Sequence, residues 1–292
     1  MTTTRETTNH SVETEQTTVA YYVTGPLPTA DGRPPLVLIG QPMTSEGFVT
    51  LGGFFPDRTV VTYDPRGGGN TVRKDGRTEV DPVDQAADVH AVIEAIGGPV
   101  DLFGTSGGAI TGLALVANYP DDVRVFVAHE PPLLTALPDA DLATEAFRKV
   151  TEVYQAKGWG HGMGAFIALT QIGGELTQPF DVDALPDPAM FGLPTQDDGK
   201  RSDPLLSGVA TPVTDYRLDV DALQAAPTKV VIAGGIESKP TITWRTSEAT
   251  AAALGSALAV FPSHHAGFLG GEYGQAGQPE EFAAKLREYV DA

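Results

Sequence analysis

The chain has 292 residues, of which 19 are Lys or Arg and 38 are Asp or Glu, so its formal net charge is −19, and it contains no cysteine. A field this negative repels nucleic-acid phosphates and anionic lipid headgroups, so we expect neither nucleic acid nor a membrane as a partner. Without cysteine the chain has no disulfide, thiolate metal ligand or cysteine nucleophile, and no apolar run approaches the roughly 20 residues of a membrane-spanning helix. We therefore expect a cytoplasmic protein.

The first elements in chain order are a polar segment and a series of short strands. Residues 1–17 are rich in Thr and predict a disordered tail, and residues 18–24 predict an edge strand. Apolar runs bounded by turn residues and separated by helical spacing follow at 36–39, 59–63, 100–103 and 123–128. Because continuous apolar strands that alternate with helices are typical of a parallel sheet covered on both faces, the sequence predicts an α/β fold.

This alternation stops near residue 132. Residues 133–212 are rich in Gly, Pro and Asp and have mixed helical and loop character, which we interpret as one insertion. The sheet resumes at 230–233, and a strand at 258–261 and an amphipathic closing helix follow. The predicted core therefore consists of two segments, 18–132 and 213–292.

The strongest local signal for chemistry is Gly104-Thr105-Ser106-Gly107-Gly108, between the strand at 100–103 and a helix of small residues. This is the G-x-S-x-G pattern of a nucleophile elbow in its strand–turn–helix context. Gly104 and Gly108 are needed because a Cβ at either position would clash with the turn. Ser106 would stand at the carboxyl edge of the sheet, with the Gly107 N–H as first oxyanion donor. The alternative is a dinucleotide-binding or structural turn, but the G-x-G-x-x-G spacing is absent.

With this elbow and four further segments, the chain resembles proteins of the α/β-hydrolase fold over nearly its whole length. In order, the segments resemble the family's His-Gly-x-Pro loop, D-x-R-G turn, acid turn and histidine loop; they are 39–43, 63–67, 234–237 and 261–268. The resemblance implies a mostly parallel central sheet with helices on both faces. It also implies that residues 133–212 form the cap, or lid, that selects the substrate.

A serine nucleophile needs a base, and the base needs a carboxylate that fixes its tautomer. By resemblance the base is His265, because the family's histidine precedes x-Gly-aromatic, as His265 does here and the competing His264 does not. The predicted acid is Glu237, just after the strand at 230–233. Glu130, at the end of the strand before the insertion, is the alternative acid. The order Ser106, Glu237, His265 matches the order in this fold.

The second oxyanion donor should come from the loop after the strand at 36–39. Gln41 fits because Pro42 has no N–H, and Met43 is the next choice. Further residues that we expect to contact a substrate are Met43, His129, Trp159 and Phe166.

Together these features predict a serine hydrolase that needs no cofactor or metal and cleaves an ester, lactone or related acyl bond of a small molecule through an acyl-enzyme. The same residues could serve C–C bond hydrolysis, acyl transfer or perhydrolysis on this fold. A ligand-binding protein without catalysis is the alternative from another class, against which the complete Ser, acid and His set argues.

Overall fold

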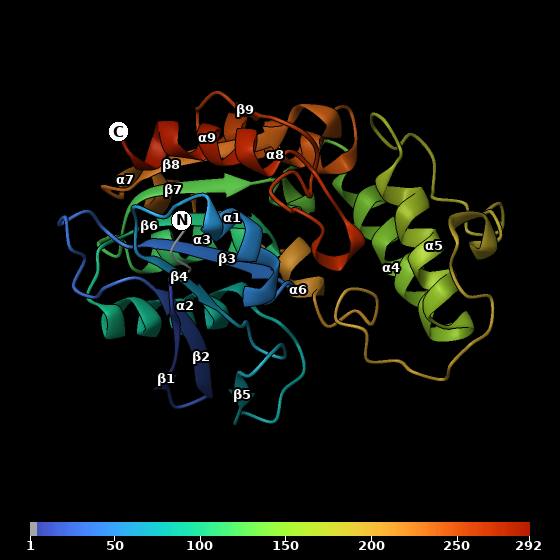
Figure 1. Cartoon of the computed structure of the whole chain (residues 1–292). Coiled ribbons are helices and arrows are strands. Elements are labelled where there is room, and N and C mark those ends of the chain that lie inside the picture. The colour runs from blue at the N-terminus through green and yellow to red at the C-terminus, as the bar shows by residue number, and fades with distance from the viewer. Residues whose placement is uncertain (1–4) are drawn as a thin grey trace.

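The apolar runs of the sequence form the parallel centre of a nine-stranded sheet in the computed structural model, which describes residues 5–292 (Figure 1). The strand order is β1-β2-β4-β3-β6-β7-β8-β9, and β5 pairs with β2. The six strands β4, β3, β6, β7, β8 and β9 all pair in parallel. The pairs β1–β2, β2–β4 and β2–β5 are antiparallel. The strands are β1 Thr7–Glu13, β2 Thr17–Thr24, β3 Leu36–Gln41, β4 Val60–Tyr63, β5 Val72–Arg73, β6 Val100–Ser106, β7 Val123–His129, β8 Lys229–Gly235 and β9 Ala259–Phe261. The predicted α/β class is confirmed.

The N-terminal segment corrects two predictions. Residues 7–13, expected within a disordered tail, form β1 and pair with β2 over their full length. The side chains of β1 are almost all exposed to solvent. Because neither face of this strand is buried, its residues are polar, and its composition resembles that of a disordered segment. With β1 at the edge, β2 is an interior strand and not the predicted edge strand. The first four residues of the predicted tail lie outside the described residues.

Helices cover both faces of the sheet, and each face has its own apolar cluster (Figure 1). One face is covered by α2 Pro82–Ile96, α3 Gly107–Asn118, α7 Val220–Ala225 and α8 Ile242–Ala253; the other by α1 Val49–Gly53 and α9 Pro279–Val290. The start of α2 shows how local residues determine where a helix begins. Asp81 accepts hydrogen bonds from the backbone N–H groups of Val83 and Asp84, and Pro82 occupies the first turn, where its missing N–H costs nothing.

The predicted insertion, residues 133–212, is a helical unit whose two long helices lie beside the sheet and whose ends pack against the core (Figure 1). It contains α4 Ala140–Lys157, α5 Trp159–Thr170 and the short turns η2 Leu134–Ala136 and η3 Pro188–Phe191; its predicted end falls inside α6 Thr211–Thr214. The helices α4 and α5 have an apolar cluster of their own. They approach closely at Gly162, where a Cβ would lie 2.6 Å from the Tyr154 side chain. Within residues 5–292, no helix is long and apolar enough to cross a lipid bilayer.

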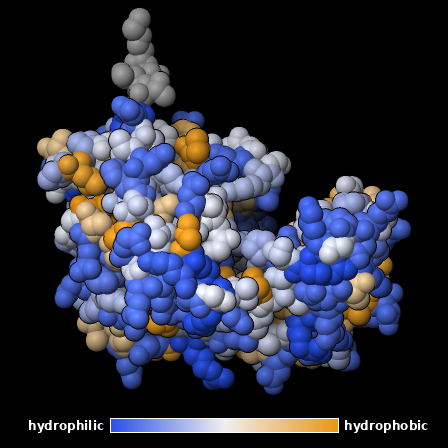
Figure 2. Space-filling view, turned by 90° about the horizontal axis from the view of Figure 1, so that it is seen from below, coloured by the Kyte–Doolittle hydropathy of each residue, from blue (hydrophilic) through white to orange (hydrophobic). Residues whose placement is uncertain are grey.

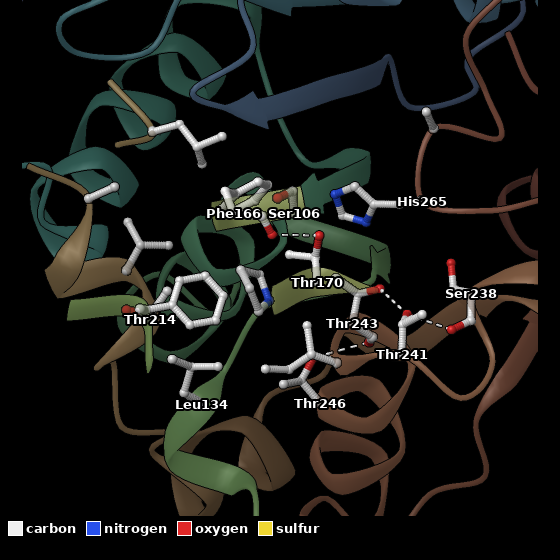
Figure 3. A pocket seen from close by; sticks show the side chains of 18 of the residues that line it. Ser106, Leu134, Phe166, Thr170, Thr214, Ser238, Thr241, Thr243, Thr246 and His265 are labelled. Carbon is white, nitrogen blue, oxygen red and sulfur yellow. Dashed lines mark hydrogen bonds between the residues drawn. The ribbon is translucent and has the colours of Figure 1, made fainter. Parts of the chain in front are cut away.

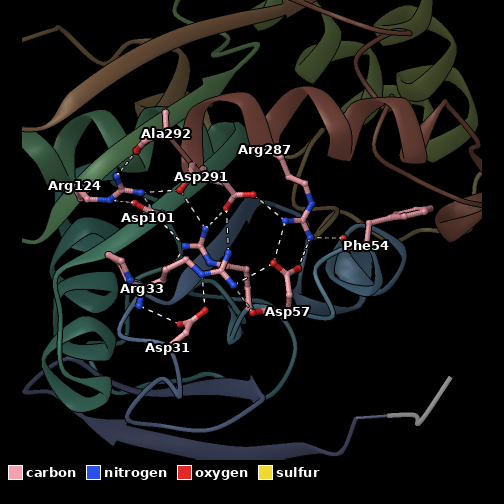
Figure 4. A network of polar contacts seen from close by, with 12 residues as sticks. Asp31, Arg33, Phe54, Asp57, Asp101, Arg124, Arg287, Asp291 and Ala292 are labelled. Atoms are coloured by element: carbon pink, nitrogen blue, oxygen red, sulfur yellow. Dashed lines mark hydrogen bonds and ion pairs between the residues drawn. The ribbon is translucent and has the colours of Figure 1, made fainter.

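A buried ion pair network ties the amino end of β6 to the end of α9 (Figure 4). The fully buried Asp101 carboxylate accepts hydrogen bonds from Arg58 at 2.6 Å and from two nitrogens of Arg124 at 2.9 Å. Arg58 also bonds Asp291 at 2.7 Å. Removing one member of a buried pair leaves the other charge without full compensation. The resulting loss of stability is larger than the net stabilisation that the intact pair provides.

We therefore expect Asp101→Asn to lower the free energy of unfolding by about 3 kcal/mol. The matched control is Asp31→Asn, at the exposed rim of the same network, which should cost under about 1 kcal/mol. Urea denaturation of both variants tests this. Equal losses for the two variants would show that burial of the Asp101 pair has no special weight.

Candidate active site

Ser106 has the strained geometry of a nucleophile elbow. It ends β6 and directly precedes α3, with φ 55° and ψ −130°, a conformation that non-glycine residues rarely adopt. A Cβ on Gly104 would lie 2.8 Å from the Gly108 carbonyl oxygen, and one on Gly108 would lie 2.6 Å from the Ile39 carbonyl oxygen. Backbone atoms cannot move away cheaply, so the predicted need for glycine at both positions is confirmed.

The carboxylate that holds His265 is Glu130, which corrects the prediction of Glu237. Glu130 directly follows β7, has φ 48° and is fully buried. One carboxylate oxygen, Oε2, bonds Nδ1 of His265 at 2.7 Å, and the other, Oε1, accepts the N–H of Gly235 at 2.8 Å. The alternative that the sequence left open is thus the one that the geometry supports.

Burial opposes ionisation of Glu130, but the interactions with its neighbours outweigh burial and favour the charged form. The hydrogen bond and charge of His265, together with His129 and the Ser238 hydroxyl, hold the pKa of the Glu130 carboxyl well below its usual range. An ionised carboxylate can only accept hydrogen bonds.

Glu237 lies on the wall of the cavity that Ser106 and His265 also line, but it does not bond His265. The chain turns after β8, and the turn η4 Ile236–Ser238 leaves Glu237 at an exposed position. Its Oε1 accepts from Nε2 of Gln278 at 3.1 Å, and its Oε2 accepts from the Ser263 hydroxyl at 3.5 Å. Glu237 does follow β8, but the carboxylate that bonds His265 is that of Glu130.

The two adjacent histidines differ in the partner of ring nitrogen Nδ1. Since the Glu130 carboxylate can only accept, Nδ1 of His265 carries a proton, and in the neutral ring Nε2 is therefore the nitrogen with the lone pair. In His264, Nδ1 accepts the N–H of Ala266 at 3.1 Å within its own loop. Only His265 therefore combines a carboxylate partner with a free Nε2, which is the arrangement expected of a general base.

Gln41 lies where the sequence placed it, beside the serine. It ends β3 and pairs in register with Ser106. A Cβ on Gly107 would lie 2.9 Å from the Gln41 carbonyl oxygen, so the two backbones approach closely. Both residues line the cavity that Ser106 and His265 also line (Figure 3). Their N–H groups as oxyanion donors stay a prediction.

Comparison with solved structures establishes the fold. An esterase from Thermogutta terrifontis superposes with a TM-score of 0.63 at 21% identity, covering 96% of this chain and 97% of the esterase. A hydrolase from Pseudomonas aeruginosa PA01 gives a TM-score of 0.64 at 18% identity, covering 97% and 98%. The chain is an α/β-hydrolase-fold protein.

Among curated proteins, the α/β-hydrolase-fold chain is similar to a Bacillus subtilis (strain 168) protein named uncharacterized hydrolase YraK. The two are 27% identical over 215 residues, and this aligned region covers 72% of this chain and 73% of that protein. No family model matches the chain.

The cavity of this α/β-hydrolase-fold protein has a volume of about 480 Å³ and lies between the carboxyl edge of the sheet and the helical unit of residues 133–212 (Figure 3). Its walls combine apolar and polar side chains from the core and the inserted unit. They include Leu134, Phe147, Phe166, Leu205, Val213 and Ile242 on the apolar side, and Thr170, Ser238, Thr241, Thr243 and Thr246 on the polar side.

Of the residues that we expected to contact a substrate, Phe166 lines this cavity and the others do not. Met43 packs against Gly40 and Gly47. Trp159 donates its indole N–H to Asp203 at 3.0 Å inside the helical unit. His129 is fully buried.

The polar wall of the cavity was not predicted from the sequence. One signal was available, because Thr243 and Thr246 are spaced by three residues on α8 and therefore share a face of that helix.

His129 is buried in an aromatic cluster behind the site. Its Nδ1 bonds the Thr105 hydroxyl at 3.2 Å, its Nε2 has no partner among the described residues, and its ring packs 5.0 Å from that of Phe282. Burial lowers its pKa to about 4, although the neighbouring Glu130 opposes the shift. The folded state therefore binds fewer protons than the unfolded state between pH 6.5 and 4, so His129 destabilises the fold as pH falls through this window.

Replacing His129 with leucine should remove this contribution to the pH dependence of stability. Between pH 7 and 4.5 we expect His129→Leu to lose about 2 kcal/mol less unfolding free energy than the wild type. Urea titrations at the two pH values measure this, with His161→Leu as the control. An unchanged pH dependence would mean that His129 is already charged in the fold.

Proposed function

We propose that this chain is a serine hydrolase that cleaves an ester, lactone or related acyl bond and forms an acyl-enzyme on Ser106. The observation that carries the proposal is the pairing of His265 with the buried Glu130 carboxylate at 2.7 Å, in the same cavity as a strained serine. The names of the similar proteins, a hydrolase from Bacillus subtilis and an esterase from Thermogutta terrifontis, agree with it.

In the proposed first step, Nε2 of His265 takes the Ser106 hydroxyl proton while Oγ bonds the carbonyl carbon of the substrate. The negative charge that develops on the carbonyl oxygen is held by the N–H groups of Gly107 and Gln41. Protonated His265 then gives the proton to the departing alcohol oxygen as the bond to carbon breaks. Glu130 stabilises the imidazolium that exists between these transfers.

A water molecule completes the cycle by the same route in reverse. His265 removes a proton from the water, the hydroxyl attacks the acyl carbon, and Ser106 leaves with the proton from His265, so that the acid is released and the enzyme is restored.

We further infer that residues 133–212 act as the cap. Phe147 of α4 and Phe166 of α5 line the cavity together with core residues, so these two helices help to bound the space that an acyl group would occupy. A cavity of about 480 Å³ suits a small molecule.

A panel of 4-nitrophenyl esters with acyl chains of increasing length tests the proposal. We expect saturable release of 4-nitrophenol with a maximum at short or medium chains, since the apolar wall favours methylenes until the cavity is full. Rates no higher than those of buffer for every ester would count against acyl hydrolysis as the activity.

A further inference from the structure

The charged residues around the cavity are unequally distributed. Among the described residues that line it, Glu237 is the only carboxylate, and none is a lysine or arginine. The basic residues that follow in the same segment are engaged elsewhere. The Lys239 ammonium lies over the Trp244 ring, 5.4 Å from its centre, and Arg245 is paired with Asp139.

The charge of Glu237 is uncompensated. The two hydrogen bonds that hold its carboxylate come from Gln278 and Ser263, which are both neutral. It forms no ion pair within residues 5–292, and its side chain is exposed at the cavity wall. Because neutral donors orient the carboxylate without cancelling its charge, it is free to attract a cation.

The hydroxyl groups of the cavity wall also favour a donor-bearing ligand. Four threonine hydroxyls each donate to a backbone carbonyl: Thr170 to Phe166 at 2.9 Å, Thr214 to Thr211 at 3.1 Å, Thr241 to Ser238 at 2.5 Å and Thr246 to Thr243 at 3.0 Å. A hydroxyl has one proton, so what these groups still have to offer is the acceptor lone pairs of their oxygens (Figure 3).

We propose that the cavity prefers acyl substrates that carry an ammonium group and discriminates against carboxylates, with Glu237 setting this preference. The inference rests on the proposed acyl hydrolysis at Ser106 and gives Glu237 a role other than the acid that the sequence suggested. The net charge of −19 adds a long-range attraction of the same sign.

The test uses three butanoate esters of nearly equal shape, whose alcohols end in dimethylammonium, isopropyl and carboxylate groups: 2-(dimethylamino)ethanol, 3-methylbutanol and 3-hydroxypropanoate. At pH 7 and low salt, we expect kcat/KM for the ammonium ester to exceed that of the neutral ester about fivefold, and the carboxylate ester to be slower than the neutral one by a similar factor. Added salt should narrow both ratios.

Two variants that each remove one negative charge test whether Glu237 causes the difference between the esters. Glu237→Gln should bring both ratios closer to one and leave only the small preference that the net charge of the chain supplies. Glu15→Gln removes the same charge from the turn between β1 and β2, and it should keep the wild-type ratios. Equal kcat/KM values for the three esters in the wild type, or ratios that Glu237→Gln does not change, overturn the inference.

Binding separates failure of this inference from failure of the proposed function. The butyl ethers of the same three alcohols cannot be hydrolysed, and calorimetry should give Kd values in the same order with the same response to Glu237→Gln. If no ester is turned over, the proposed hydrolysis fails, and the ethers alone decide the charge preference. Equal Kd values for the three ethers contradict it.

Discussion

Replacing Ser106 with alanine should lower kcat for ester hydrolysis by a factor on the order of 10⁴ to 10⁶, which leaves only the catalysis that the oxyanion donors and binding supply. The reason is that alanine removes the nucleophilic oxygen and nothing else. The residue at this turn already has φ 55°, and an alanine methyl group is smaller than the serine side chain. Initial rates with the most reactive 4-nitrophenyl ester measure the loss.

The folded state of this variant should be intact, so its urea unfolding midpoint should match that of the wild type. If Ser106→Ala retains a substantial fraction of wild-type kcat with an unchanged midpoint, another residue supplies the nucleophile.

The second large effect concerns the acid. We expect Glu130→Gln to lower kcat by about 10³ to 10⁴, by analogy with loss of the triad carboxylate elsewhere. The two oxygens of Glu130 accept from Gly235 and His265, whereas a glutamine has only one acceptor oxygen. The variant must therefore lose one of these bonds as well as the charge that stabilises the imidazolium. Because the pKa of the Glu130 carboxyl is held well below its usual range, its ionisation should not appear in the rate profile above pH 4.

Glu237→Gln is the matched control for this prediction, since it makes the same chemical change in the other candidate. With the neutral 3-methylbutyl ester as substrate, its loss of kcat should be far smaller than that of Glu130→Gln. A larger loss for Glu237→Gln would restore Glu237 as the acid and require the loop that carries His265 to move.

The sequence was informative where structure is determined locally. The elbow at Ser106 depends on a strand, two glycines and a helix that are contiguous in the chain, and each leaves a mark on composition. The buried parallel strands were equally visible as apolar runs. β1 was not, because an exposed antiparallel strand needs only a partner, and its polar residues gave no apolar pattern.

The acid could not be decided in this way because its position depends on contacts distant in the chain. Glu130 and Glu237 both follow buried strands, and a carboxylate type and a strand end are all that the sequence gives. What separates them is that β7 lies next to β6 in the sheet, and that η4 turns Glu237 outward while Glu130 stays buried beside Gly235. The cavity wall is similar. Phe166 and Trp159 are both aromatic residues of α5, and only packing shows that Trp159 bonds Asp203 while Phe166 reaches the cavity.

In the proposed mechanism, His265 and Glu130 activate Ser106 as a nucleophile. The most direct measurement is treatment of the folded protein with a fluorophosphonate, which bonds to activated serine oxygens, followed by mass mapping of the adduct. We predict one adduct, on Ser106, that is absent in Ser106→Ala and forms orders of magnitude more slowly in Glu130→Gln than in Glu237→Gln. An adduct on another residue, or an unlabelled wild-type protein, would contradict the claim.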